Sequence, residues 1–164
     1  MNSNIATQRI HQRWMEKALA LAKVAGEKGE IPIGAVVVMN QTIIGQGYNQ
    51  CETLHDPTAH AEMIAISAAA NTLNDWRLSK STLYVTKEPC AMCAGAIINA
   101  RIRMVVFGCY DEKYGCCGSQ HMLCGDQRLG SKTTIIGGVR ELECRSLLQT
   151  FFHKQRNTSG KTTV

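Results

Sequence analysis

Residues 82–95 read TLYVTKEPCAMCAG, and this stretch decides how the rest of the chain is interpreted. TLYVT (82–86) predicts a short buried strand, because β-branched and aromatic residues are enriched in strands. A helix is predicted to follow from Pro89 to about residue 100, since proline is favoured at the first helical position, where its missing N–H costs nothing. A strand that runs into a helix is the repeating unit of an α/β sheet. Two cysteines three residues apart stand at this junction.

The flanking sequence supplies the remaining elements. IGAVVVM (33–39) is an almost continuous apolar run, which is typical of a buried strand, and a turn at Asn40–Gln41 joins it to a second strand in a hairpin. Apolar residues at spacings of three and four predict amphipathic helices. The predicted helices cover 8–28, 59–70 and 140–154, the last with Leu142, Leu147, Leu148, Phe151 and Phe152 on its apolar side, and the other predicted strands cover 42–48, 103–109 and 132–138.

This order of elements predicts an α/β fold, a three-layer α/β/α arrangement around a five-stranded mixed sheet. The opening hairpin is antiparallel, whereas strands that alternate with helices pair in parallel. About 23 residues separate the last two strands, enough for the crossover that parallel pairing requires.

Length and composition indicate one domain over residues 1–164, with a core at about 8–156 and a flexible tail at 157–164. No run of 18 apolar residues occurs, so no transmembrane helix and no membrane partner are expected. The N-terminus lacks the apolar region of a secretory signal, which predicts a reducing, cytoplasmic location for the eight cysteines. The net charge of +5 permits a polyanionic partner.

Two segments carry the chemistry, DPTAHAE (56–62) and EPCAMC (88–93). His60, Cys90 and Cys93 are the ligand types that suit Zn²⁺, and each stands at or near the start of a predicted helix. Helix starts gather at the carboxyl edge of a parallel sheet, so the three side chains are expected to converge there. Three protein ligands leave one position for water, which is the catalytic pattern, whereas a structural zinc clip has four.

Glu62 follows His60 by two residues, and two such positions in a regular helix point in nearly opposite directions. The two side chains therefore converge only if His60 stands at the helix entry, which Pro57 makes plausible. A carboxylate beside a zinc site can take the proton of a water molecule and hand it on. Glu62 is thus the predicted catalytic residue; a structural zinc clip or a buried helix with incidental cysteines are the alternatives.

At these residues the chain resembles the zinc-dependent cytidine-deaminase-like superfamily, whose signature pairs HxE with PCxxC. The segments NQCETLHDPTAHAEMIAI, TLYVTKEPCAMCAGAIINARI and VVFGCYDEKYG resemble the bacterial tRNA-specific adenosine deaminases over roughly residues 10–155. The resemblance implies hydrolytic conversion of adenosine to inosine at the wobble position of a tRNA anticodon. It also implies a homodimer with one Zn²⁺ per subunit, ligated by His60, Cys90 and Cys93, with Glu62 as the proton shuttle.

The same resemblance implies a substrate pocket that contacts the flipped base through Asn49, the backbone N–H of Ala61 and the Lys87–Glu88 turn, with Asp111 near the ribose. Candidate phosphate contacts are Arg101, Arg103, Lys113, Lys154 and Arg156.

The chain departs from the family at Tyr110, where a basic residue is expected, and in its short basic tail, and both departures bear on the RNA substrate. A small-molecule nucleobase or nucleoside deaminase and a non-catalytic zinc-stabilised RNA-binding module are the competing functions. YGCCGSQHMLC (114–124) offers a second possible metal set of Cys116, Cys117, His121 and Cys124, against small-residue packing.

Overall fold

A computed structural model of the chain describes residues 2–159. The helices are α1 (Asn2–Glu27), α2 (Cys51–Leu54), α3 (Ala61–Leu73), α4 (Ala91–Asn99) and α5 (Glu141–Ser159), with a 3-10 turn, η1 (Gln127–Leu129). The strands are β1 (Gly34–Met39), β2 (Thr42–Tyr48), β3 (Thr82–Lys87), β4 (Met104–Cys109) and β5 (Thr134–Ile136).

The five strands form one mixed sheet in the order β2-β1-β3-β4-β5. β1 is antiparallel to both of its neighbours, while β3, β4 and β5 are parallel. Asn40 and Gln41 both have a positive φ, 49° and 58°, as a two-residue hairpin turn requires, so the predicted hairpin is confirmed. The predicted five-stranded α/β fold is confirmed as well.

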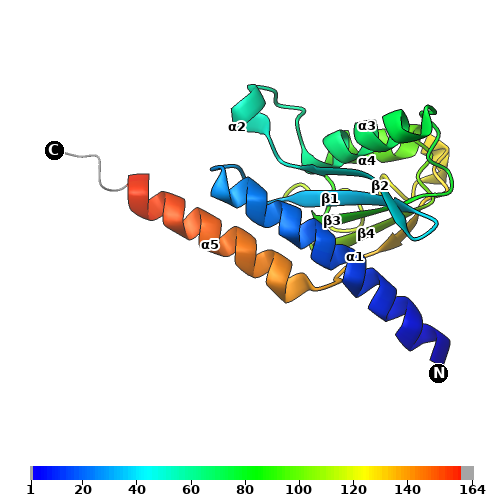
Figure 1. The fold of residues 1–164 in the computed structure, drawn as a ribbon, viewed down its shortest axis with the longest axis horizontal. Helices are drawn as coiled ribbons and strands as arrows, with labels where there is room; N and C mark the ends of the chain where they lie inside the picture. The colour runs from blue at the N-terminus through cyan, green and yellow to red at the C-terminus, as the bar shows by residue number, and fades with distance from the viewer. Residues whose placement is uncertain (1, 160–164) are drawn as a thin grey trace.

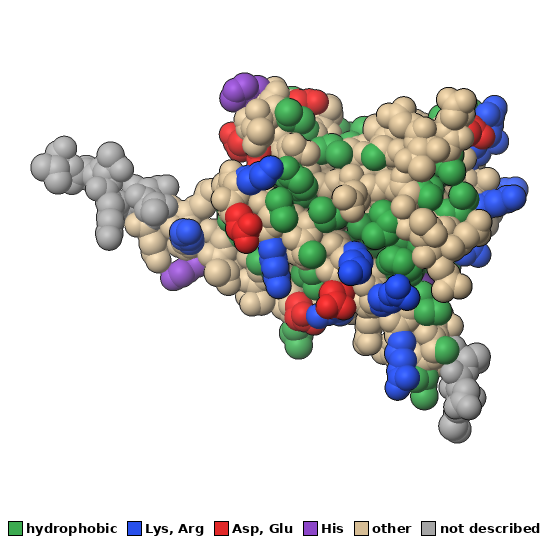
Figure 2. All heavy atoms as spheres, viewed as in Figure 1, with side chains coloured by type: hydrophobic (Ala, Val, Ile, Leu, Met, Phe, Trp, Pro, Cys, Tyr) green, Lys and Arg blue, Asp and Glu red, His purple; other side chains and the backbone are tan. Residues whose placement is uncertain are grey.

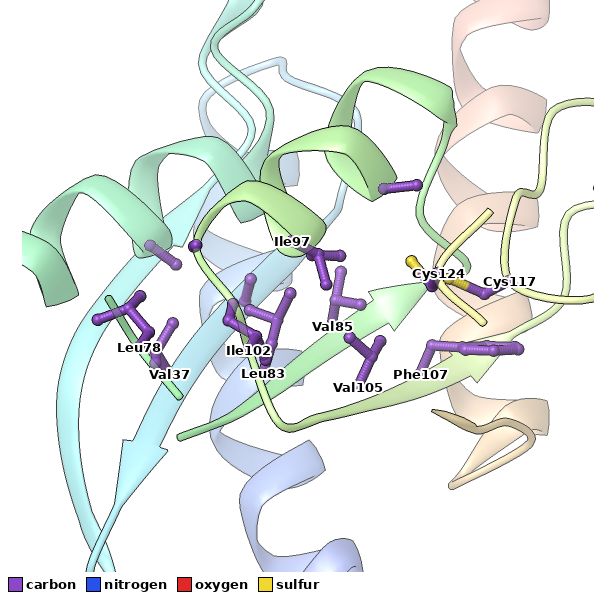
Figure 3. Packing of buried hydrophobic residues seen from close by; sticks show 14 of the residues in the cluster. Val37, Leu78, Leu83, Val85, Ile97, Ile102, Val105, Phe107, Cys117 and Cys124 are labelled. Carbon is purple, nitrogen blue, oxygen red and sulfur yellow. The ribbon is translucent and has the colours of Figure 1, made fainter. Parts of the chain in front are cut away.

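Helices cover both faces of the sheet in three layers, with α1 and α5 side by side on one face and α3 and α4 on the other (Figure 1). The alternation of β1 supplies both interfaces. Ala35 and Val37 pack with α3 and α4, and Val36 and Val38 pack with α1. Figure 3 shows the first of these interfaces, where the side chains of β3 and β4 point toward α4.

Glycines in two strands bring the helices close to the sheet. A Cβ on Gly34 would lie 2.2 Å from the carbonyl oxygen of Ala18 in α1, and a Cβ on Gly45 would lie 2.3 Å from that of Ala65 in α3. In both cases the added Cβ would clash with the backbone of the helix. Neither helix could therefore keep its position if the strand residue facing it carried a side chain.

Several predicted boundaries are wrong. α1 begins at Asn2 rather than at residue 8. The prediction missed this first part of the helix because residues 5–10 are exposed and so give no apolar periodicity. β5 spans three residues rather than 132–138, and Gly138, at φ +82°, turns the chain away from the sheet. α5 runs to Ser159, so residues 157–159 of the predicted flexible tail are helical, whereas 160–164 lie outside the described residues. Leu142 is 82% exposed and is not part of the apolar side of α5, which packs through Cys144, Leu147 and Leu148.

The start of α4 also differs from the prediction. Its first residue is Ala91, and Cys90 is the extended N-cap with ψ 177°, so Pro89 is not the first helical residue. The carbonyl oxygen of Pro89 accepts a hydrogen bond from the Cys116 N–H at 2.8 Å, and this tertiary contact holds the residue outside the helix.

Candidate active site and metal centre

The sheet topology brings the functional segments to one edge. β2 and β3 end there, followed respectively by Asn49 and by Glu88–Cys90, and β4 ends beside them at Cys109. α3 and α4 both begin at this edge, as expected for a site at the carboxyl ends of parallel strands.

His60 is the N-cap of α3, with an extended backbone at ψ 153°. Its conformation confirms the prediction that this residue stands at the helix entry, and it allows the His60 and Glu62 side chains to reach the same cavity. Cys90 is the equivalent N-cap of α4, and Cys93 lies within the first turn of that helix.

The three predicted ligands converge. The Nδ1 atom of His60 lies 3.7 Å from Cys90 Sγ and 3.5 Å from Cys93 Sγ, and the three ligand atoms all lie within 4.8 Å of one another. A tetrahedral ion with the zinc bond lengths of imidazole and thiolate holds these atoms about 3.6 Å apart. The side chains therefore fit a tetrahedral metal ion. Within residues 5–157 no other group of three or more His, Cys, Asp or Glu side chains has such a geometry.

The electrostatics of the two sulfurs favour a cation between them. Hydrogen bonding from Cys93 lowers the pKa of Cys90 to about 3, and the same contact, together with burial, raises the pKa of Cys93. The hydrogen bond to Cys90 raises the pKa of His60. Without a metal ion, Cys90 and Cys93 thus favour a state with one thiolate and one thiol. A bound metal ion stabilises both sulfurs as thiolates.

Glu62 is buried in the wall of the same cavity. No cation forms an ion pair with its carboxyl group among the described side chains. Burial raises its pKa, so the group is poised to accept and release a proton. A structural metal clip has no need of such a carboxyl group, whereas proton transfer at a metal-bound water requires one.

The cavity has a volume of about 490 Å³, which is within the range of small-molecule binding sites. Beside His60, Glu62 and Cys90, it is lined on one side by Ile33 and by the start of α4, and on the other by the segment 111–121. The lining residues from the end of β3, from the residue after it and from this segment are Lys87, Glu88, Asp111, Lys113, Tyr114, Cys116, Gln120 and His121.

The predicted substrate contacts are placed unequally. Asp111 lines the cavity and forms an ion pair with Lys87 at 2.6 Å. Asn49 is buried one layer behind the wall, where its N–H donates to the carbonyl oxygen of Ile33 at 3.0 Å. Ala61 is the first residue of α3 and is fully buried, and its side chain does not line the cavity.

Of the five predicted phosphate contacts, only Lys113 lies at this cavity. Arg101 and Arg103 lie next to the amino end of β4, at the opposite edge of the sheet. Lys154 and Arg156 lie on the exposed last turns of α5.

The possible second metal set does not converge among the described residues. His121 lines the catalytic cavity, whereas Cys117 and Cys124 are buried beside Phe107 in the core (Figure 3). Small buried thiols at these positions complete the packing under the segment 111–121.

Glu88 has a structural function that the sequence analysis, which named only the Lys87–Glu88 turn as a pocket contact, did not predict. It is 2% exposed, and its carboxylate accepts hydrogen bonds from the backbone N–H groups of Asp111, Cys117 and Ser119, each at 3.0 Å, and from the Ser119 hydroxyl group. Gly115 passes so close that a Cβ there would lie 2.3 Å from Glu88 Oε2. Glu88 therefore fixes the segment that forms one wall of the cavity. Its position directly before PCxxC was the available signal.

Glu30 holds a second segment, from Asn49 into α2, through the same kind of contact. It is fully buried, and its carboxylate accepts hydrogen bonds from Asn49 Nδ2 at 3.0 Å and from the backbone N–H groups of Glu52 and Thr53 at 3.3 and 2.7 Å. Burial acts to raise its pKa, but these hydrogen bonds outweigh it and lower the pKa. A lone acidic residue after a helix gives no sequence signal for this function.

The geometry of the site agrees with the comparisons to known proteins. The MafB19-like deaminase family model matches residues 10–156. The tRNA-specific adenosine deaminase of Bacillus subtilis is 46% identical over 143 residues, 87% of this chain and 89% of that protein. The Haemophilus influenzae protein of the same name is also 46% identical, over 88% of this chain and 84% of its own length.

The chain belongs to the tRNA-specific adenosine deaminase family. A solved structure from a study of tRNA:A34 deaminases acting in A-to-I editing superposes with a TM-score of 0.80 at 40% identity, over 83% of this chain and 99% of the other. A guanine deaminase from Bacillus subtilis matches less completely, with a TM-score of 0.59 over 61% of this chain and 64% of its own, at 40% identity. The family resemblance inferred from HAE and PCAMC is thereby confirmed, and the protein is a deaminase.

Proposed function

We propose that this deaminase converts adenosine to inosine at the wobble position of a tRNA anticodon, with Zn²⁺ held by His60, Cys90 and Cys93. The convergence of these three ligand atoms beside the buried Glu62 carries the proposal. The ligand set of two thiolates and one imidazole is typical of zinc sites with three protein ligands. Relatives named as tRNA-specific adenosine deaminases support the choice of substrate.

The residues of the chain divide the chemistry between them. Zinc, when bound, supplies the Lewis-acid activation of a water molecule. Glu62 takes a proton from that water and delivers it to the purine ring nitrogen N1 as the oxygen adds to C6. Glu62 then takes the remaining proton of the added hydroxyl group and passes it to the exocyclic nitrogen. The bond from C6 to that nitrogen breaks, the C6 carbonyl of inosine forms, and ammonia leaves. The burial of the Glu62 carboxyl group keeps bulk water from competing for these protons.

The binding contacts follow from the walls of the cavity. Glu30 orients the Asn49 side-chain amide behind the cavity wall, and Lys87 forms an ion pair with Asp111 in the lining. Lys113 is the basic side chain placed to contact a phosphate of the anticodon loop. A base in a single-stranded loop leaves its stack at small cost, so the cavity needs no duplex to be opened.

We also infer that two copies of the chain associate. The outward face of α4 carries Met92, Gly95 and Ala96, all half-buried, and a Cβ on Gly95 would have no neighbour within 4 Å. A face of small and apolar residues at helical spacing allows a second subunit to approach closely. Sedimentation equilibrium of the purified chain and of Gly95→Lys tests this, with a monomeric variant expected.

A cytoplasmic location agrees with a tRNA substrate and is part of the proposal. Between residues 2 and 159, no helix combines the length and the apolar character of a membrane span.

The decisive experiment incubates the purified protein with an anticodon stem-loop that has A at the wobble position. Free guanine, adenosine and cytidine are the parallel substrates, because the guanine deaminase match makes a free base the second candidate substrate. Glu62→Ala is expected to keep its zinc and its fold and to lose inosine formation. Glu27→Ala, at an exposed carboxylate of α1, is the matched control and should retain full activity. Inosine made by the Glu62 variant would refute the mechanism, and turnover of a free base alone would assign the substrate to the second class.

A further inference from the structure

A second cavity lies at the sheet edge opposite the catalytic one. It has a volume of about 430 Å³ and is formed where the chain enters β3, β4 and β5. Its lining is basic and hydroxylic, with Ile98, Ile102 and Gly130 between the polar groups. The polar lining residues are Ser79, Arg101, Arg103, Ser131, Lys132 and Thr133.

Three cations converge on this cavity, and no Asp or Glu lines it. Among residues 5–157, none of Arg101, Arg103 and Lys132 belongs to an ion pair. The face covered by α1 and α5 differs, because acidic side chains lie among the Lys and Arg side chains there (Figure 2). Like charges that share a cavity repel one another, and a bound anion removes that repulsion.

The cavity is held by backbone contacts rather than by its charged side chains. The Thr133 hydroxyl group donates to the carbonyl oxygen of Ile102 at 2.8 Å, and the Thr134 N–H donates to the carbonyl oxygen of Arg103 at 2.9 Å. The Ser131 hydroxyl group donates a hydrogen bond to the carbonyl oxygen of Cys124. The segments before β4 and β5 are thus fastened together, and their cations are presented from a fixed frame.

An aromatic ring stands beside the cations. The guanidinium of Arg101 lies over the Trp76 ring at 5.2 Å from its centroid, and the Trp76 side chain is half exposed. The guanidinium of Arg77 lies over the same ring, 4.3 Å from its centroid, so the indole holds two cations by cation–π contacts and keeps Arg101 in place at the cavity.

We propose that this cavity binds a phosphate of the RNA substrate outside the anticodon loop. β4 has six residues, so the cavity lies about 20 Å from the catalytic edge, roughly the length of six stacked base pairs. A tRNA with its wobble base in the catalytic cavity can therefore reach this edge with its stem. The assignment of this phosphate to tRNA rests on the proposed tRNA substrate. The ability of the cavity to bind a phosphate group does not depend on that proposal.

The test measures the affinity of the full chain for full-length tRNA and for a short single-stranded oligonucleotide with the anticodon sequence, across a salt series. Arg103→Ala/Lys132→Ala is compared with Lys17→Ala, which removes an exposed cation of α1. The double variant should bind tRNA about tenfold or more weakly, with a salt slope lower by about 2, and should bind the oligonucleotide like the wild type. Arg103→Gln/Lys132→Gln, which keeps much of each side chain, should repeat the result if the Ala variant is poorly folded.

Two outcomes would overturn the proposal. In the first, the double variants bind tRNA with unchanged affinity and salt slope. In the second, inorganic pyrophosphate raises the melting temperature of the wild type but not of the variants while tRNA binding stays unchanged, which would assign the cavity to a free phosphorylated compound. Inosine formation by the wild type is measured first, so that failure of the proposed function is seen separately.

Discussion

Replacing Glu88 by Gln should release the wall of the catalytic cavity without touching the metal ligands. The wild-type carboxylate accepts three backbone hydrogen bonds and one from the Ser119 hydroxyl group. Glutamine keeps the acceptor that faces the Cys117 and Ser119 N–H groups. Its amide nitrogen then stands where Glu88 Oε2 accepted from the Asp111 N–H, so two donors face each other.

The expected loss is one charge-assisted hydrogen bond, worth about 1.5–3 kcal/mol, and some cost for a buried N–H left without an acceptor. We expect the free energy of unfolding to fall by about 2–4 kcal/mol, and the melting temperature to fall by roughly 4–16 °C. Because the segment 111–121 lines the cavity, KM for the anticodon stem-loop should rise more than kcat falls.

Urea denaturation and steady-state kinetics on Glu88→Gln and Ser119→Ala test this. The Ser119 variant is the control, because it removes one neutral donor and leaves the three backbone bonds. A Glu88→Gln protein with stability within 0.5 kcal/mol of wild type and an unchanged KM would show that the carboxylate does not hold the segment.

Three further predictions concern charge, metal and packing. Burial acts to raise the pKa of Asp111, but the contact with Lys87 and two backbone N–H groups outweigh burial and lower the pKa below its ordinary 3.8. The stability that the Asp111 carboxylate contributes should therefore disappear as the pH falls below 3.8. In Asp111→Asn, the urea midpoint should depend less on pH in that range. Metal analysis should find about one zinc ion per wild-type chain, near zero in Cys93→Ala and about one in Cys124→Ala. Two zinc ions per wild-type chain would indicate that the second cysteine and histidine set also binds metal. Gly45→Ala should lose about 1–3 kcal/mol by pushing α3 off the sheet, while Gly26→Ala, whose Cβ meets only Pro32 Cβ at 3.5 Å, should lose nothing; equal stabilities in thermal melts would contradict the close packing.

The sequence predicted the elements that depend on local pattern. The apolar run of β1, the turn at Asn40–Gln41 and the strand β2 were predicted within a residue of their observed positions. Strand and helix periodicities are properties of neighbouring residues, which a single chain displays directly. The metal ligands were predicted because three soft ligands at two helix starts restrict the topology strongly.

Boundaries that depend on a distant partner were not predictable in this way. Pro89 would begin α4 if only its own preference counted, but its carbonyl oxygen is bonded to Cys116. Of the predicted strand 132–138, only Thr134, Ile135 and Ile136 pair with β4, and this pairing sets the length of β5. Leu142 fits the apolar pattern of α5 and yet is exposed, because no other element of the described part of the fold covers it.

By itself, then, the sequence determined the fold class, the candidate ligand set and the need for His60 to stand at a helix entry. The tertiary structure decided which side chains support that site and which face the opposite edge. Glu30 and Glu88 act on backbone groups more than 20 residues away, and the cavity at Arg103 and Lys132 joins loops separated by the whole of β4. Such contacts depend on how the strands are ordered in the sheet, and strand order is not written in any local pattern of residues.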